Sequence, residues 1–375
     1  MHYPSWELGD QLFLTRLLPE PDQVDLQATA TTSQRLTEGA RRSAEAQAAA
    51  TLLPAYATEF RSVFAKEDFD MLPEHHKWDH VIELIPGAES KSSKVYPLSP
   101  LEQAELDAFL EENLRTGRIR PSKSPMAASV FFIKKKDGSL RLVQDYCALN
   151  AVTVKNRYPL PLISELVSQL RGARYFTKLD VHWGFNNVRI KPRDEWKTAF
   201  CTNRGLFEPL VMFFGMTNSS ATFQTMMNDI FRTVIAEGIV AVYLDNILIF
   251  TKTEEEHERA VRRVLEILAE HKLFLRPEKC EFHQKQIEYL GLVISENTVA
   301  MDPVKVAGVH EWPTPESRTD VQAFIGFVNF YCCFIQDFST IARPLFDLTR
   351  SDHTWNWGTK EQEAFERLKM AVLRR

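Results

Sequence analysis

Two aspartates lie in sequence surroundings that disfavour a charged side chain. Asp245 stands between the apolar runs 240–244 and 247–250, and Asp180 ends the strand-like run 175–180. A buried, ionised carboxylate costs several kcal/mol unless a cation or hydrogen bonds compensate for it. Paired carboxylates suit Mg²⁺, and two such ions can activate an attacking hydroxyl and stabilise a leaving phosphate. The pair therefore predicts a metal centre for nucleotidyl transfer, whereas for isolated aspartates turn capping would be the simpler alternative.

The elements that would position these aspartates are short strands mixed with amphipathic helices. Strands are predicted at residues 128–133, 140–146, 175–180, 187–191, 198–202, 206–212 and 287–294, and the two apolar runs beside Asp245 predict a buried hairpin. Apolar side chains at three- and four-residue spacing predict helices beginning at Ser99-Pro100 and covering residues 223–237, 261–268 and 324–331. Because no βαβ repeat is present, the pattern favours an α+β fold.

Composition limits the remaining classes of protein. The 375 residues are 44% hydrophobic and 25% charged, which is ordinary for a globular protein. The net charge of -5 argues against a generally basic coat protein, so a nucleic-acid site must be local. The five cysteines show no Cys-x-x-Cys spacing, and the most apolar stretch, residues 239–250, is too short to cross a bilayer. Since no signal peptide is evident, we expect an intracellular protein, in a cytoplasmic particle or the nucleus, without membrane attachment.

Five motifs follow one another in the order of a known family. They are Tyr158-Pro159-Leu160-Pro161, Leu179-Asp180-Val181, Phe214-Gly215-Met216-Thr217-Asn218, Tyr243-Leu244-Asp245-Asn246 and Tyr289-Leu290-Gly291. Over residues 55–375 the chain resembles the reverse transcriptase of gypsy-type LTR retrotransposon Pol polyproteins. The resemblance implies a right-hand polymerase fold with fingers, palm and thumb. It also implies an RNA or DNA template with its primer, dNTP substrates and two Mg²⁺ ions, which Mn²⁺ could replace.

The resemblance also implies a division of the chain. Residues 1–50, rich in Ala, Thr, Gln and Glu, are expected to be a disordered linker, and residues 51–115 an N-terminal extension. Residues 116–297 correspond to the fingers and palm, and residues 298–375 to the thumb or connection. The last helical pattern runs to Arg375, so we expect a fragment that stops before a ribonuclease H domain. Neither the resemblance nor the composition predicts an oligomeric state.

Roles can be transferred residue by residue from the family. Asp180 and Asp245 correspond to the ligands of both metal ions, together with the main-chain carbonyl of Val181. Lys135, Lys136 and Arg141 correspond to the cations of the fingers hairpin that hold the triphosphate, where ammonium and guanidinium groups complement phosphate oxygens. Read without the family, those three cations would be a solvated loop, and Val181 a core residue.

The remaining site residues surround the nucleotide and the primer. Phe185 corresponds to the aromatic gate that collides with a ribose 2′-hydroxyl and so favours deoxynucleotides. Phe214 and Gly215 correspond to the turn beneath the incoming nucleotide, and Tyr289-Leu290-Gly291 to the hairpin that holds the primer end. Lys279 corresponds to a lysine near the pyrophosphate, a proton donor to the leaving group. A core phenylalanine and a surface lysine are the plainer interpretations of Phe185 and Lys279.

Asn246 departs from the family, which has a second aspartate at this position. The amide keeps the shape of the acid but removes one negative charge, so metal binding should suffer. A catalytically impaired, nucleic-acid-binding remnant is therefore the alternative function. A ribonuclease or integrase is less favoured because no matching third acid follows. Further departures replace Arg with Cys or His, or Pro with Ser, which suggests decay of the gene by cytosine deamination; they are Cys147, Cys332, Cys333, His182, Ser129 and Ser220.

Overall fold

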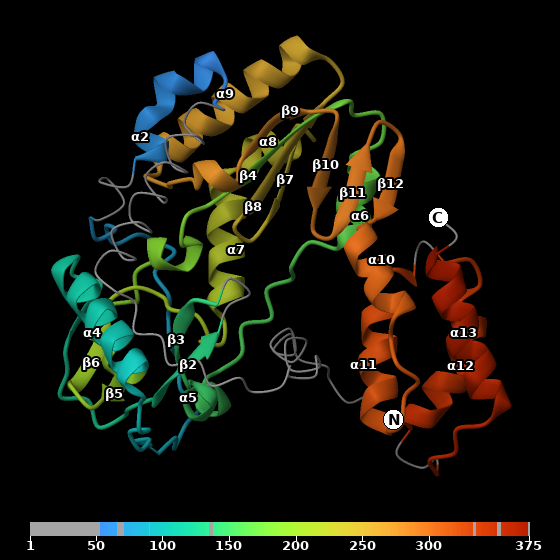
Figure 1. The fold of residues 1–375 in the computed structure, drawn as a ribbon. Helices are drawn as coiled ribbons and strands as arrows, with labels where there is room; N and C mark the ends of the chain where they lie inside the picture. Colours follow the sequence, from blue (N-terminus) through green and yellow to red (C-terminus); the bar gives the residue numbers. More distant parts are fainter. Residues whose placement is uncertain are drawn as a thin grey trace. The chain divides into compact units, whose positions relative to one another are not determined.

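The computed structural model describes residues 53–65, 71–89, 91–134, 138–332, 335–350 and 354–373. These residues belong to two compact units, drawn in Figure 1. The larger unit extends to Tyr289 and includes residues 295–298, and the smaller contains residues 290–294 and the chain from Val299 onward. The linker predicted for residues 1–50 lies outside the described residues, as do Lys135 and Lys136.

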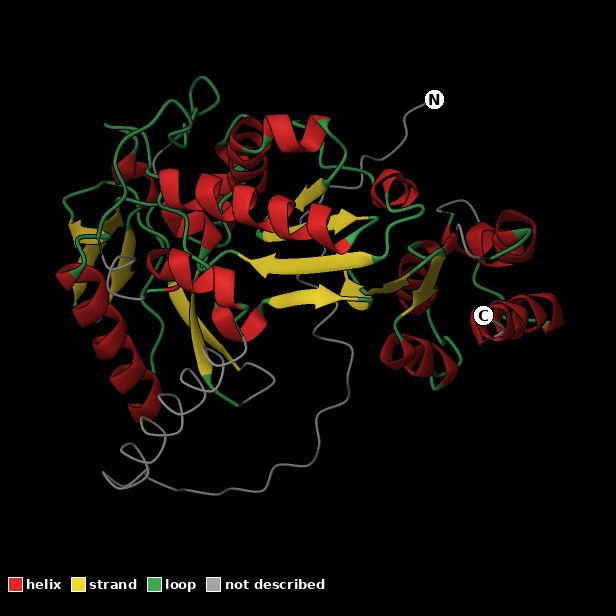
Figure 2. Cartoon of the chain, turned by 90° about the horizontal axis from the view of Figure 1, so that it is seen from above, coloured by secondary structure: helices red, strands yellow, loops and turns green. Residues whose placement is uncertain are grey.

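A four-stranded antiparallel sheet forms the centre of the larger unit. Its order is β7-β8-β4-β9, with β4 (Tyr175–Asp180), β7 (Val240–Tyr243), β8 (Asn246–Thr251) and β9 (Glu281–Gln284). Helices α7 (Ser219–Ile230), α8 (Arg232–Ala236) and α9 (Glu254–Glu270) pack on these strands, as Figure 2 shows in red and yellow. The predicted strand 175–180 and the predicted hairpin are thus confirmed.

The helix predicted over residues 223–237 is interrupted. Phe231, with φ −94° and ψ 12°, separates α7 from α8, although its N–H still bonds to the carbonyl of Met227. The ring of Phe231 is fully buried. In α9, the Thr253 side chain accepts a hydrogen bond from the Glu256 N–H, and three glutamates occupy the first turn. Both features stabilise the beginning of a helix.

Smaller elements surround this centre. They are η2 (Ala55–Phe60), α2 (Arg61–Phe64), α4 (Pro100–Arg115), β1 (Ile119–Pro121), β2 (Val130–Lys134), β3 (Leu140–Gln144), α5 (Cys147–Val152), α6 (Ile163–Gln169), η3 (Gly184–Asn187), η4 (Glu195–Thr198), β5 (Phe200–Thr202), β6 (Gly205–Pro209), η5 (Pro277–Lys279) and β10 (Gln286–Tyr289). β2 and β3, which lie within the strands predicted at 128–133 and 140–146 or extend them by one residue, pair antiparallel. α4 begins where a helix was predicted, and Ser99 and Glu102 form a capping box at its start.

Two strands predicted from the sequence are wrong. Residues 187–191 form no strand; after η3 they make only isolated bridges, Arg189 to Val211 and Ile190 to His80. Residues 287–294 are interrupted because Leu290 and Gly291 both have positive φ, 52° and 78°. The next strand, β11 (Leu292–Ser295), begins after this reversal. Leucine rarely adopts that conformation, so its residue type did not predict the turn.

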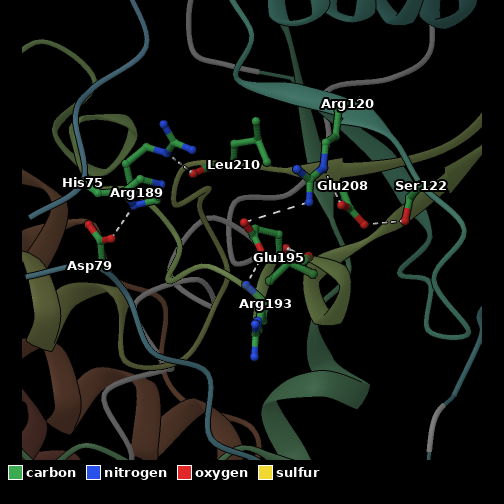
Figure 3. A network of polar contacts seen from close by, with 10 residues as sticks. His75, Asp79, Arg120, Ser122, Arg189, Arg193, Glu195, Glu208 and Leu210 are labelled. Atoms are coloured by element: carbon green, nitrogen blue, oxygen red, sulfur yellow. Dashed lines mark hydrogen bonds and ion pairs between the residues drawn. The ribbon is translucent and has the colours of Figure 1, made fainter.

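Within the larger unit, polar contacts join the segment around Pro73 to residues far along the chain. The Arg189 guanidinium donates to the carbonyls of Leu210 (3.0 Å) and Pro73 (3.1 Å). Figure 3 shows Arg189 with a nearby cluster in which Glu208 accepts hydrogen bonds from Arg120 and Ser122, both at 2.6 Å. The segment around residue 73 is therefore part of the folded unit.

The smaller unit is helical around an aromatic core. It contains all but the first residue of β12 (Thr298–Met301), together with α10 (Pro303–His310), α11 (Arg318–Asn329), α12 (Phe338–Thr349) and α13 (Thr359–Leu373). The rings of Phe324 and Phe365 lie 4.6 Å apart between centroids, and Trp312 contacts Phe324 at 5.7 Å. The helix predicted around 324–331 is thus part of α11. Among the described residues, no helix is long and apolar enough to cross a membrane.

Candidate active site

The strand register brings the two aspartates to the same end of the central sheet. Asp180 ends β4 directly opposite Asn246 of β8, and Leu244 and Asp245 form the two-residue turn between β7 and β8. The Val181 N–H donates to the Asp245 carbonyl over 2.9 Å. Leu244 has φ 52°, a conformation that costs energy for a residue with a side chain. A strained turn of this kind presents Asp245 beside Asp180.

Burial makes both carboxylates resist ionisation. Burial raises the pKa of Asp180, and the neighbouring charge of Asp245 raises it further, while Lys279 and Arg276 oppose the shift. Burial likewise raises the pKa of Asp245. The Lys279 Nζ and Arg276 Nε atoms lie 3.7 and 3.9 Å from the Asp180 carboxylate oxygens. These distances are too long for good hydrogen bonds, so the local cations compensate the two charges incompletely.

The oxygen atoms at this site fit a hard divalent cation. Two carboxylates are present beside the main chain of Val181, whose N–H bonds to the Asp245 carbonyl. Mg²⁺ is commonly held by one or two carboxylates, with water and substrate phosphates completing its octahedron. No group of three or more His, Cys, Asp or Glu side chains that could hold a metal occurs in the described part of the chain. The third oxygen side chain is Asn246, an amide.

Asn246 is held between Asp245 and Tyr289. Its Nδ2 lies 3.2 Å from Asp245 Oδ1, and its main-chain carbonyl accepts a hydrogen bond of 3.3 Å from the Tyr289 hydroxyl. Burial raises the pKa of Tyr289, so this hydroxyl stays protonated and can donate. Tyr289 thus lies beside the carboxylates. Leu290 and Gly291 belong to the smaller unit, where they form the left-handed turn described above.

Three of the predicted nucleotide-binding residues meet in one aromatic cluster. The ring centroids of Phe185 and Phe214 are 5.1 Å apart, and the guanidinium of Arg141 lies 5.6 Å from the Phe214 ring. Phe223 of α7 packs edge-on against Phe185 at 5.6 Å. A Cβ atom on Gly184 would lie 2.8 Å from the Phe223 ring and 3.4 Å from Asp245 Cβ. Only glycine at 184 allows this close approach.

The turn at Gly215 is fixed by a residue that the motifs did not indicate. Gly215 has φ 93°, which glycine tolerates. Asn150 of α5 donates from Nδ2 to the Gly215 carbonyl and accepts from the Thr217 N–H, both at 2.8 Å. Phe214 is left 50% exposed at the edge of this turn. Asn150 therefore positions the turn predicted to lie beneath the nucleotide.

The departures from the family lie in different surroundings. Ser129 is buried, and its hydroxyl has no hydrogen-bond partner among the described residues. Such a position suits an apolar residue such as proline better than serine. Cys147 and Cys332 are exposed, and Cys333 falls outside the described residues.

Solved structures define the class of this fold. The chain is similar to the foamy viral protease-reverse transcriptase in complex with an RNA/DNA hybrid (TM-score 0.71, 18% identity, covering 95% of this chain and 48% of that chain). It is similar also to the form of that protein, named dRH, in complex with double-stranded DNA (TM-score 0.74, 19% identity, covering 94% and 62%). The chain therefore has the right-hand polymerase fold, an α+β architecture.

The family follows from sequence. Residues 133–294 match the family model described as Reverse transcriptase (RNA-dependent DNA polymerase), and this part of the chain is a reverse transcriptase domain. The Transposon Tf2-7 polyprotein of Schizosaccharomyces pombe is 36% identical over 322 residues, and the Tf2-3 polyprotein of the same organism is 35% identical. The match covers 86% of this chain, but the chain spans only about a quarter of those relatives (24%).

Proposed function

We propose that this chain is the polymerase part of a gypsy-type LTR retrotransposon Pol polyprotein and catalyses RNA-directed DNA synthesis by adding dNTPs to a primer. The observation that carries the proposal is the meeting of Asp180 and Asp245 at one end of the central sheet, with incompletely compensated charges and raised pKa values. Carboxylates kept in a folded protein at such a cost are typical of functional sites.

Asp180, Asp245 and the Val181 carbonyl would hold two Mg²⁺ ions. When bound, these ions would lower the pKa of the primer 3′-hydroxyl and neutralise the triphosphate. Lys279 lies within reach of the same carboxylates and is suited to give a proton to the leaving pyrophosphate. Tyr289 holds the main chain of Asn246, and with Leu290 and Gly291 we assign it to the primer end.

The aromatic cluster would select the nucleotide. Arg141, with Lys135 and Lys136, would bind the triphosphate, while Phe214 and Gly215 would support the nucleotide from below. Phe185 is held from two sides by Phe214 and Phe223, so its ring cannot easily move away from a ribose 2′-hydroxyl. A fixed ring at this position favours dNTPs.

We further propose residues 51–115 as an N-terminal extension, residues 116–297 as fingers and palm, and residues 298–375 as thumb or connection. The expected partners are an RNA or DNA template with its primer, inside the cell.

The alternative is a nucleic-acid-binding remnant without turnover. It rests on Asn246, whose amide faces the Asp245 carboxylate where a third acid would add charge for the metal ions. The unpartnered hydroxyl of Ser129 agrees with a decaying gene.

Primer extension on poly(rA)/oligo(dT) with Mg²⁺ or Mn²⁺ distinguishes an active polymerase from a remnant without turnover. We expect measurable extension, and an increase of about tenfold for Asn246→Asp because an added carboxylate strengthens metal binding. Asp180→Asn in either background should abolish extension. Extension by the Asn246→Asp variant alone would favour the remnant, and no extension by any variant, with duplex binding intact, would refute the polymerase.

A further inference from the structure

Gln224 is a buried polar residue whose amide contacts the β7–β8 turn. It lies in α7 between Phe223 and Met226, and it is 0% exposed. Its Oε1 accepts from the Leu244 N–H over 2.8 Å, and its Nε2 donates to the Val242 carbonyl over 3.1 Å. Because a backbone N–H only donates and a carbonyl only accepts, the backbone fixes the orientation of this amide.

The contact completes an edge of the central sheet. β7 is the outer strand in the order β7-β8-β4-β9, so the outward backbone groups of Val242 and Leu244 have no neighbouring strand. Buried backbone groups need partners, and the Gln224 amide supplies them as a peptide group of another strand would. The bonded Leu244 is the residue with φ 52°, directly before Asp245. Gln224 thus holds the strained residue that directs the carboxylate.

A chain of hydrogen bonds continues outward from Gln224. Its Nε2 also donates to Asn228 Oδ1, and Asn228 Nδ2 donates to the Tyr158 hydroxyl, both over 2.8 Å. Tyr158 begins the Tyr-Pro-Leu-Pro motif, to which the proposed function assigns no role. Since Asn228 must offer its oxygen to Gln224, only its nitrogen is left for Tyr158. The motif is therefore connected to the turn that carries Asp245.

We infer that Gln224 is a positioning residue for Asp245: by fixing the backbone of Val242 and Leu244 it aims the Asp245 carboxylate at the metal site, and Asn228 with Tyr158 forms its outer support. The inference rests on the proposed function, because it adds a residue to that site. Gln224 acts through Leu244 and touches neither substrate nor metal. Its removal should therefore misplace Asp245 without removing a ligand.

Gln224→Met tests the inference, because it keeps the length of the side chain and removes both hydrogen bonds to the turn. We expect kcat for primer extension to fall about 10–100-fold, since small displacements of reacting groups have effects of this size, with KM for dTTP changed by less than about threefold. Amide exchange at Leu244 should accelerate, and Mn²⁺ binding followed by electron paramagnetic resonance should weaken. Thr225→Ala is the matched control, since the Thr225 hydroxyl donates to the Ala221 carbonyl of its own helix and, among the described residues, makes no bond to the β7–β8 turn.

Two milder variants keep the test decisive if Gln224→Met does not fold. Tyr158→Phe and Asn228→Ala should each lower kcat about two- to fivefold at unchanged melting temperature. Wild-type kcat, Mn²⁺ affinity and Leu244 exchange in every folded variant would overturn the inference. If no protein extends primers, even with Asn246→Asp, the proposed function fails, while Mn²⁺ binding and Leu244 exchange still decide the role of Gln224.

Discussion

The central sheet carries two polar sites, one buried and one partly buried, that differ in how closely the protein's own groups contact them. At the first, His257 of α9 bonds through Nε2 to the Thr177 hydroxyl (2.8 Å) and through Nδ1 to the Thr251 hydroxyl (3.0 Å). At the second, the nearest cationic atoms lie 3.7 and 3.9 Å from the Asp180 carboxylate. The histidine ring has a hydrogen-bond partner at each nitrogen, whereas the two printed cation contacts of the Asp180 carboxylate are longer than good hydrogen bonds.

The histidine site even fixes its own tautomer. The Thr251 hydroxyl donates to the Thr253 carbonyl, so it must accept from His257 Nδ1. The Thr177 hydroxyl accepts from the His283 N–H and is free to donate to Nε2. A second proton, on His257 Nε2, would point at the hydrogen of the Thr177 hydroxyl. Completed polar networks stabilise the fold, and incomplete ones mark places where binding compensates the cost.

The largest effect is expected at the carboxylate site, where one substitution should lower activity and raise stability. We expect Asp245→Asn to lower primer extension about 10³-fold, because a metal ligand contributes several kcal/mol to the transition state. The pKa of Asp245 is raised in the folded protein, so its ionised form destabilises the fold at neutral pH, and the amide should raise the free energy of unfolding. Urea unfolding and primer extension measure the two effects. Glu266→Gln, at an exposed position of α9, is the control.

At the histidine site we expect the opposite: a substitution should lower stability and leave activity nearly unchanged. His257→Leu leaves the Thr177 and Thr251 hydroxyls without their ring partner, which should lower the free energy of unfolding by about 3 kcal/mol. Activity per folded molecule should stay within about twofold, because His257 contacts neither aspartate. A stable but inactive variant would contradict the comparison between the two sites.

The free energy of unfolding should depend on pH through the buried histidines. Burial lowers the pKa of His257 to about 3 and that of His80, whose Nδ1 contacts the Thr222 hydroxyl, to about 4. The unfolded chain takes up these protons below pH ~6.5, so the free energy of unfolding should fall as the pH drops toward those values. From pH 7 to 5 we expect a loss of about 2 kcal/mol per histidine. Urea unfolding at both pH values measures it; His80→Asn should reduce the dependence, whereas the exposed His310→Asn should not.

The smallest expected effect is on the selection of deoxynucleotides over ribonucleotides. Phe185→Val shortens the proposed gate and should raise incorporation of rUTP relative to dTTP by about tenfold or more, measured as a ratio of kcat/KM. Phe214→Ala removes one of the two rings that hold Phe185, so it should weaken binding of both nucleotides and raise that ratio by less than Phe185→Val does. An equal ratio in Phe185→Val and the wild type would remove the gate from the site.

Local patterns were sufficient for much of the fold. The two apolar runs beside Asp245 predicted the hairpin, and the spacing of apolar residues predicted α4, α9 and α11, because these elements follow from their own residues. The failures occur where the backbone takes conformations that its residue types do not reveal. Leu290 and Phe231 interrupt a predicted strand and a predicted helix. The run 187–191 makes only isolated bridges, from Ile190 to His80 and from Arg189 to Val211, and so forms no regular strand.

The residues of the candidate site likewise include some that the sequence indicated and some that it did not. Asp180, Asp245, Phe185 and Phe214 were recognisable because their types and motifs carry the chemistry. Asn150, Gly184 and Gln224 were not, although a glutamine within the apolar face of a helix is a signal that could have indicated Gln224. Their roles depend on partners far along the chain, such as Gly215 and Leu244.

The sequence by itself determined which side chains have the chemistry to bind metal and nucleotide, and that an amide, Asn246, follows Asp245. Only the tertiary structure decided that Asp180 faces Asn246, that Phe223 lies against both Gly184 and Phe185, and that a buried amide holds the turn before Asp245. The physical reason is that residue type sets what a group can bind, whereas strand register and long-range hydrogen bonds set where it lies.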